Sequence, residues 1–138
     1  ACINPDGMPF TCLADVGVRK KQYIEALNFY LKNTTRKIVF VENSGTDISS
    51  SFKDFQHRIE FLCFDGNLCF DKRKGKGYGE ALILEYAMAK SEFITDDVLI
   101  FKLTGRLQLI NINRLIHYMD KLSPSKVFTT DYYSIFYR

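Results

Sequence analysis

The chain has 138 residues, 46% of them apolar and 25% charged, with a formal net charge of +3 at pH 7. This length fits one domain with a core of its own, and 19 basic against 16 acidic residues is too even a balance to favour nucleic acid as a partner. No apolar run approaches the roughly 20 residues of a membrane span, because Glu85 and Lys102 interrupt the two best candidates. The first residues do not resemble a secretory signal.

Cysteine usage favours free thiols. The four cysteines lie in or beside apolar stretches, without a CxxC pair: Cys2, Cys12, Cys63 and Cys69. A disulfide framework is disfavoured in a chain with this much other core material, and His57 and His117 stand at no zinc-ligand spacing. We therefore expect buried thiols in a reducing compartment.

The elements of the first half are predicted from its apolar patterns. Residues Ala1 to Ile3 are typical of the end of a strand before the turn "NPDG". A helix is predicted over Val18–Leu31, capped by Asp15; its apolar face carries Tyr23, Ala26, Leu27, Tyr30 and Leu31. The run "KIVFV" predicts a buried strand that enters the turn "ENSGTD", and a short helix is expected at Ser50–Gln56.

The second half continues the alternation. A strand is predicted at "IEFLCF", then a well-buried helix from Gly79 to Phe93, a fourth strand at "VLIFKL" and a helix at "NINRLIHYMDKL". A fifth strand at "KVFTT" ends at Asp131. This alternation predicts an α/β fold with an open, mostly parallel, Rossmann-like sheet and helices on both faces. We expect a single domain over residues 1–138, cut from a longer protein at both ends.

Polar residues follow each predicted strand, where parallel sheets bind ligands. They are Asn4, Pro5, Glu42, Asn43, Asp65, Thr104, Gly105, Arg106 and Asp131. Polar loops are common anyway, but a carboxylate directly after the apolar strand "KIVFV" is less expected.

The segment "DKRKGKGYGEALILEYAMAKS" combines glycines, cations and a helix start. Gly75, Gly77 and Gly79 alternate with residues that include Lys74 and Lys76. Converging N–H groups and a helix start favour an anion such as phosphate, although Glu80 adds negative charge there. The spacing is neither a P-loop nor GxGxxG. A solvated basic turn before a helix remains the alternative.

The stretches "VFVENSGTD", "KGKGYGEALILEYAMAKS" and "KLTGR" together resemble bacterial glycosyltransferases of the GT-A type that build capsule, O-antigen or related surface polysaccharides. The resemblance covers the chain from Asn4 to about Asn113. It implies the donor-binding half of such an enzyme, in which a nucleotide-sugar lies across the ends of the first strands.

The resemblance also implies roles for particular residues. Base and ribose contacts would come from Asn4, Pro5, Glu42, Asn43 and Asp65, and diphosphate contacts from Lys74, Lys76, Gly77, Gly79, Thr104 and Arg106. GT-A enzymes usually carry a metal-binding DXD motif where this chain has "FKLTGRL", which lacks a carboxylate. Either Asp131 and residues beyond it hold a divalent metal, or Lys76 and Arg106 replace the metal, which we favour. No catalytic base is identified.

The resemblance further implies a glycan or lipid-linked glycan acceptor and a cytoplasmic location, with the inner face of the cell membrane as an alternative. A homodimer remains open. Two non-enzymatic readings compete. One is a single-strand nucleic-acid binder that uses "KRKGKGYG" and the rings of "YYSIFYR"; the other is a catalytically silent α/β domain that acts through a partner.

Overall fold

The structure is a computed structural model in which residues 1–6, 11–66, 71 and 74–121 are described. The side chain of Lys76 is not described. The predicted fifth strand and Asp131 lie outside the described residues.

The sheet consists of two parallel strands, β1 (Ile38–Glu42) and β2 (Ile59–Cys63). Their register pairs Ile38 with Ile59 and Glu42 with Cys63. The crossover between them passes through a 3₁₀ helix, η1 (Ser49–Phe55). The fold is therefore α/β with a small, open, parallel sheet, and the larger sheet that the sequence predicts does not form within the described part of the chain.

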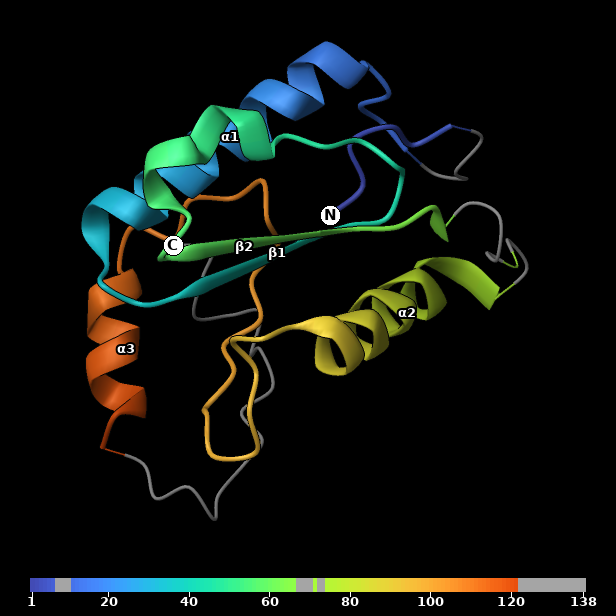
Figure 1. Ribbon diagram of the computed structural model, residues 1–138. Coiled ribbons are helices and arrows are strands. Elements are labelled where there is room, and N and C mark those ends of the chain that lie inside the picture. Colours follow the sequence, from blue (N-terminus) through green and yellow to red (C-terminus); the bar gives the residue numbers. More distant parts are fainter. Residues whose placement is uncertain (7–10, 67–70, 72–73, 122–138) are drawn as a thin grey trace.

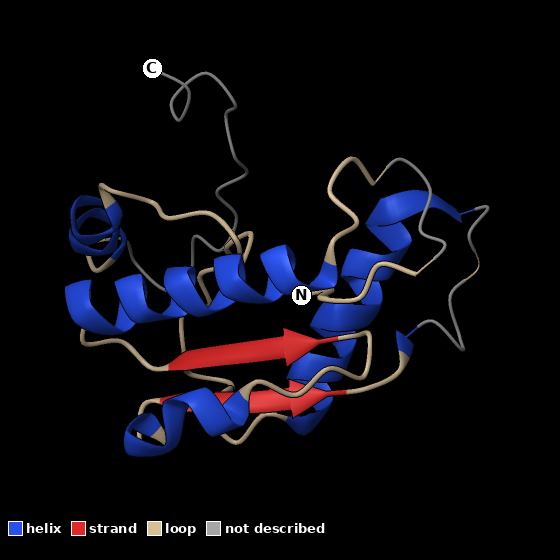
Figure 2. Ribbon diagram, turned by 90° about the horizontal axis from the view of Figure 1, so that it is seen from above, coloured by secondary structure: helices blue, strands red, loops and turns tan. Residues whose placement is uncertain are grey.

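Helices cover both faces of this sheet, as predicted. Figure 1 shows α1 (Val16–Asn33) and η1 on one face and α2 (Gly75–Lys90) on the other, with α3 (Ile112–Met119) beside the end at which β1 begins. Figure 2 shows both arrows pointing towards the end of the sheet where α2 starts. The end of the sheet towards which the strands run is called the carboxyl rim below.

The first helix is the best predicted element. The side chain of Asp15 accepts a hydrogen bond from the N–H of Val18 at 2.8 Å, so this aspartate caps the helix as expected. All five residues of the predicted apolar face are buried. At the other end, the N–H of Thr34 donates to the carbonyl of Tyr30, and the extended backbone of Thr34 ends the helix.

The main core lies between α1, η1 and the sheet face that they cover. Its buried members come from each of these elements and from the first residues of the chain: Ile3, Tyr23, Leu27, Leu31, Phe40, Ile48, Phe52 and Ile59. Aromatic rings meet edge-on or tilted, with centroids 5.6 Å apart for Tyr23 and Phe40 and 5.5 Å apart for Phe52 and Phe61. This core fixes α1 against β1, and so positions the turn that follows β1.

The second long helix differs from its prediction. It begins at Gly75 and ends at Lys90, where the N–H of Ser91 donates to the carbonyl of Ala87. Leu84 is 38% exposed and Met88 is 67% exposed, so the expectation of a well-buried helix was wrong. The helix packs on the sheet by one side, and the described residues provide no second layer to cover the rest.

The predicted fourth strand is absent from the described residues. Val98 to Phe101 form no strand and are each about two-fifths to one-half exposed, between 39% and 53%. A turn bond from the N–H of Val98 to the carbonyl of Thr95 precedes them. The residue types are those of a strand, but a strand also needs a paired neighbour, and the described residues offer this segment none.

The first residues lie along β1. The N–H of Asn43 donates to the carbonyl of Ala1 at 3.0 Å, and the amino group of Ala1 donates to the carbonyl of Val41. This is the pattern of a parallel strand pair, although the segment is too short to count as a strand. The structure therefore has no strand at Ala1 to Ile3, although the bonds of Ala1 follow the pairing expected of a strand end before "NPDG".

The described cysteines are less buried than the composition predicts. Cys12 and Cys63 are exposed and Cys2 is half-buried, so the expectation of buried thiols was wrong for the described cysteines, all three of which are free. Among the described helices, none has the length and apolarity needed to cross a membrane.

Candidate functional site at the carboxyl rim

Glu42 is the central residue of the turn after β1. Its side chain is 1% exposed, and its carboxylate accepts hydrogen bonds from the backbone N–H groups of Ile3 at 2.8 Å, Ser44 at 2.8 Å and Thr46 at 2.9 Å, and from the Ser44 hydroxyl. A buried carboxylate needs such partners. Glu42 therefore shapes the turn, and its oxygens are already engaged within the protein.

Three of the predicted nucleotide-binding residues lie around this turn. The N–H of Asn4 donates to the Ser44 hydroxyl at 2.9 Å, and Ser44 forms an antiparallel bridge with Asp65. The N–H of Gly66 donates to the carbonyl of Asn43 at 2.9 Å. Asn4, Asn43 and Asp65 are thus held together at the rim, from three separate segments of the chain.

The side-chain amide of Asn43 has an unusual position. The residue is 4% exposed, yet its Oδ1 has no hydrogen-bond partner among the described residues. Buried amide oxygens are normally paired, and each exception calls for an explanation. Asn43 also lines the cavity described below, although its Oδ1 is itself buried from solvent.

The glycine-lysine segment begins α2 at the same rim as the Glu42 turn (Figures 1 and 2). The loop expected before residue 79 is instead the first turn of the helix, so the predicted helix start was too late. Gly75 has φ of +73°, which only glycine adopts readily. The Nζ atom of Lys74 lies 4.5 Å from the ring centroid of Tyr78.

A salt bridge offsets the charge of Glu80, which lies in the second turn of α2 because the helix begins at Gly75. Lys102 Nζ lies 2.6 Å from Glu80 Oε2, with both side chains about half exposed. Glu80 was the sequence feature that counted against a bound anion. Because Lys102 neutralises it, the helix start does not carry an uncompensated negative charge from this residue.

The turn Thr104 to Arg106 packs against α1. A Cβ atom built on Gly105 would lie 3.1 Å from the ring of Tyr23, so only glycine allows this close approach. Arg106 donates to the side-chain oxygen of Gln22 at 3.1 Å. The role of Gln22 in holding Arg106 was not predicted, because the sequence does not show which distant side chain an amide on a helix will bond.

Arg19 also escaped prediction. It is 6% exposed, and its guanidinium donates to the backbone carbonyls of Cys2, Ile3 and Leu13. An arginine in a helix is most often on the surface, so its sequence position carries no hint of this role. Here it fixes the chain that leads to Asn4.

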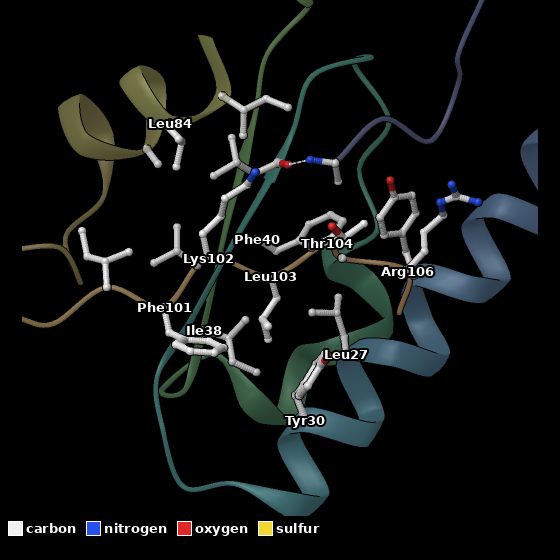
Figure 3. A pocket seen from close by; sticks show the side chains of 18 of the residues that line it. Leu27, Tyr30, Ile38, Phe40, Leu84, Phe101, Lys102, Leu103, Thr104 and Arg106 are labelled. Atoms are coloured by element: carbon white, nitrogen blue, oxygen red, sulfur yellow. Dashed lines mark hydrogen bonds between the residues drawn. The ribbon is translucent and has the colours of Figure 1, made fainter. Parts of the chain in front are cut away.

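A cavity of about 1160 Å³ lies between α1, β1, α2 and the segment from Val98 to Arg106 (Figure 3). Of the predicted site residues, Pro5, Asn43, Gly79, Thr104 and Arg106 line it, whereas Asn4, Glu42, Asp65, Lys74 and Gly77 do not. Much of the remaining lining is apolar and includes Leu27, Tyr30, Ile38, Phe40, Leu84, Phe101 and Leu103. The cavity therefore has polar residues at the rim and, with Arg36, Lys37 and Asp120, at the opposite end, and an apolar body along β1 between them.

Metal ligands are not gathered in the described residues, where no group of three His, Cys, Asp or Glu side chains could hold an ion. The sequence alternative of a metal at Asp131 involves a residue outside the described part.

Comparison of the chain with models of protein families, with curated proteins and with solved structures finds no match.

Proposed function

We propose that this chain is the donor-binding half of a glycosyltransferase of the GT-A type, which takes a nucleotide-sugar at the carboxyl rim. One observation carries the proposal: the polar turn after β1 and the basic, glycine-rich start of α2 lie at the same rim. Ligands of open α/β sheets bind at this rim, and a helix start favours the negative charge of a diphosphate.

The proposed roles follow the positions of the side chains. Asn43 lines the cavity at the rim and would contact the base or ribose. Asn4 and Asp65 come from two other segments and are held beside this turn through Ser44. Glu42 would act indirectly, because its carboxylate holds the backbone of the turn.

The diphosphate would lie at the start of α2. Lys74 and Lys76 flank Gly75 there, and Gly77 leaves open space, with no atom within 4 Å of a Cβ placed on it. Arg106 lines the same cavity as Asn43. An arginine binds phosphate oxygens through two hydrogen bonds and stays charged at neutral pH, so it suits a site in which cations stabilise the departing diphosphate.

The transfer of the sugar to a glycan or lipid-linked glycan acceptor, and a cytoplasmic location, belong to the same proposal and rest on the sequence resemblance. Residues for the acceptor and for a catalytic base are not assigned.

Isothermal titration calorimetry with the diphosphates of uridine, cytidine, guanosine and thymidine tests donor binding. We expect one of them to bind, and we expect Lys76→Ala and Arg106→Ala each to weaken binding about tenfold or more, since hydrogen bonds to charged groups contribute about 1.5–3 kcal/mol. Lys32→Ala is the matched control, because Lys32 lies in the last turn of α1 at the opposite end. Absence of heat with all four diphosphates would sink the proposal.

A partner-binding domain without catalysis is the second candidate, and one observation favours it. Large apolar side chains are exposed among the described residues, including Leu99 at 53% and Ile110 at 90%, and exposed apolar patches often mark interfaces. A monodisperse dimer in solution that responds to no nucleotide would favour this candidate over the transferase.

A further inference from the structure

Lys102 is a charged residue in an otherwise apolar part of the cavity wall. The residues before it, from Val98 to Phe101, and Leu103 after it are apolar, and all of them line the cavity. The side chain of Lys102 is about half exposed. Packing within this segment therefore does not explain the charge of Lys102.

The ammonium of Lys102 lies next to α2. Its Nζ atom is 2.6 Å from Glu80 Oε2, and Glu80 lines the cavity beside Gly79. Because α2 begins at the carboxyl rim (Figures 1 and 2), this contact places the ammonium of Lys102 near that rim.

Arg106 occupies the corresponding position on the side of α1. It lines the cavity and donates to the side-chain oxygen of Gln22 in α1 at 3.1 Å. Lys102 and Arg106 are four positions apart, which corresponds to roughly 13 Å in an extended chain. Figure 3 shows both side chains extending away from Tyr30, on the same side of the segment that carries them. They can therefore approach one ligand from two sides.

Other basic residues of this region are less suited to a ligand at the rim. The guanidinium of Arg19 is engaged with backbone carbonyls, and Arg36 and Lys37 lie at the opposite end of the cavity, before the start of β1. Lys74 does not line the cavity. Among the described residues, this leaves the lysine and the arginine of the crossing segment as the cations at the rim end.

We propose that Lys102 is a phosphate-binding residue, whose ammonium is held in place by Glu80 and donates hydrogen bonds to a phosphate group that also contacts Arg106. The inference rests on the proposed donor site, and it adds a cation that the sequence resemblance does not assign.

The hydrogen-bond donors of the two cations are sufficient for this role. An ammonium has three N–H donors and a guanidinium has five. Among the described residues, Glu80 is the one acceptor within hydrogen-bond distance of Lys102 Nζ, so two of its donors remain for a ligand. Glu80 orients Lys102 as Gln22 orients Arg106, and neither contact has to break when a phosphate binds.

The simpler role of Lys102 is that of a partner in an exposed ion pair with Glu80. Such a pair contributes little to stability and has no direct contact with a ligand. The two roles differ in what the loss of Lys102 changes. A phosphate-binding lysine contributes to the affinity for a diphosphate through charge-assisted hydrogen bonds, whereas a lysine that only pairs with Glu80 does not.

Isothermal titration calorimetry with the diphosphates of uridine, cytidine, guanosine and thymidine measures this affinity. We expect Lys102→Ala to weaken the binding seen with the parent chain by about tenfold or more. Lys102→Arg should stay within about threefold of the parent chain, because arginine keeps the charge and the donors.

Lys90→Ala is the matched control. Lys90 is an exposed lysine in the last turn of α2, at the end away from the rim. Its loss removes the same charge from the same helix, and should change the affinity by less than about twofold, since solvent and salt screen a charge at that distance.

NMR of the parent chain with ¹³C-labelled lysines tests the contact itself and does not depend on how the variants fold. The Cε resonance of Lys102, assigned from the spectrum of Lys102→Arg, should shift during the titration with the dissociation constant found by calorimetry. The Cε resonance of Lys90 should stay in place.

A tenfold loss in Lys102→Ala, with Lys90→Ala unchanged, supports the role of Lys102. An affinity of Lys102→Ala within twofold of the parent chain, or a Lys102 resonance that stays in place while binding heat is measured, would overturn this role and leave the donor site standing. Absence of heat with the parent chain and all four diphosphates would overturn both, so the two failures are distinguishable.

Discussion

The carboxylate of Glu42 accepts a hydrogen bond from the backbone N–H of Ile3 at 2.8 Å, and so ties the first residues of the chain to the end of β1. The same carboxylate holds the N–H groups of Ser44 and Thr46 in the turn that follows. One buried side chain therefore sets the positions of two of the segments that form the rim.

Replacing this carboxylate should destabilise the fold. Glu42→Gln places an N–H₂ group opposite backbone N–H donors, and we expect a loss of about 2–4 kcal/mol in the free energy of unfolding, measured by urea denaturation. Glu25→Gln is the control, because Glu25 pairs with Lys21 on the exposed surface of α1, an interaction worth less than about 1 kcal/mol. Equal stability of the two variants would contradict the assigned role of Glu42.

Arg19 should not be replaceable by lysine. Its planar guanidinium reaches carbonyls of Cys2, Ile3 and Leu13 at once, which a single ammonium cannot do. We expect Arg19→Lys to cost about 1–3 kcal/mol, whereas Lys20→Arg, on the exposed side of the same helix, leaves the urea midpoint unchanged. A midpoint for Arg19→Lys equal to that of the parent chain would show that the network contributes nothing.

Two glycines should respond in opposite ways to alanine. Gly105→Ala places a Cβ 3.1 Å from the ring of Tyr23, and we expect a loss of about 1–3 kcal/mol from overpacking. Gly77→Ala meets no atom within 4 Å in the first turn of α2 and should gain up to about 1 kcal/mol. Thermal unfolding of the two variants in parallel measures the contrast; a stabilising Gly105→Ala would contradict the packing of this turn.

Removing the carboxylate of Glu80 should strengthen anion binding. Its salt bridge with Lys102 is half exposed, so the stability change should stay below about 1 kcal/mol. Glu80 lies in the second turn of α2, where the effect of the helix start is weaker, so one negative charge fewer there should tighten nucleoside diphosphate binding by about twofold, the equivalent of about 0.4 kcal/mol. Calorimetry on Glu80→Gln that shows weaker binding would place the diphosphate elsewhere.

The thiol of Cys63 should react slowly with alkylating agents despite its exposure. Burial of the sulfur and then the charge of Glu42 raise the pKa of Cys63 above its usual range, and only the thiolate reacts readily. Peptide-resolved mass spectrometry after iodoacetamide treatment should show the Cys63 rate still rising above pH 9.

The raised pKa of Cys63 also makes the free energy of unfolding depend on pH. Because the folded chain holds the Cys63 proton more tightly than the unfolded chain, this thiol contributes stability that is lost as the pH rises through the alkaline range. Cys63→Ser should therefore flatten the alkaline fall in stability. A Cys63 alkylation rate that levels off near pH 8 would contradict the raised pKa.

The elements that the sequence predicted well are those with a local signal. The apolar face and the cap of α1 follow from helical spacing and from Asp15, and both are seen. The strands "KIVFV" and "IEFLCF" are short apolar runs that find each other as neighbours. In these elements the residues that favour the helix or strand are also the ones that become buried, so local preference and packing agree.

The missed features depend on contacts between distant segments. "VLIFKL" has the composition of a strand, but pairing is decided by a free neighbouring edge and not by the run itself. The glycines of "KGKGYG" suggested a loop, because glycine disfavours helices, yet they form the first turn of α2.

At the candidate site, the sequence singled out Glu42 as an unexpected carboxylate at the end of the apolar strand, and Glu42 holds the backbone of the turn at the rim. Its engagement with backbone N–H groups could not be read from the sequence, because the donors include Ile3, far away along the chain. The bonds of Arg19 and Gln22 are likewise long-range and leave no pattern in spacing.

The most direct test of the account is a titration of the isotopically labelled chain with nucleoside diphosphates, followed through backbone amide shifts. We predict that the amides of Asn43 and Ser44 and those of Gly77 and Gly79 shift together, with one dissociation constant, because one ligand bridges the Glu42 turn and the start of α2. Shifts confined to one of these segments, or none in either, would contradict a shared diphosphate site at the carboxyl rim.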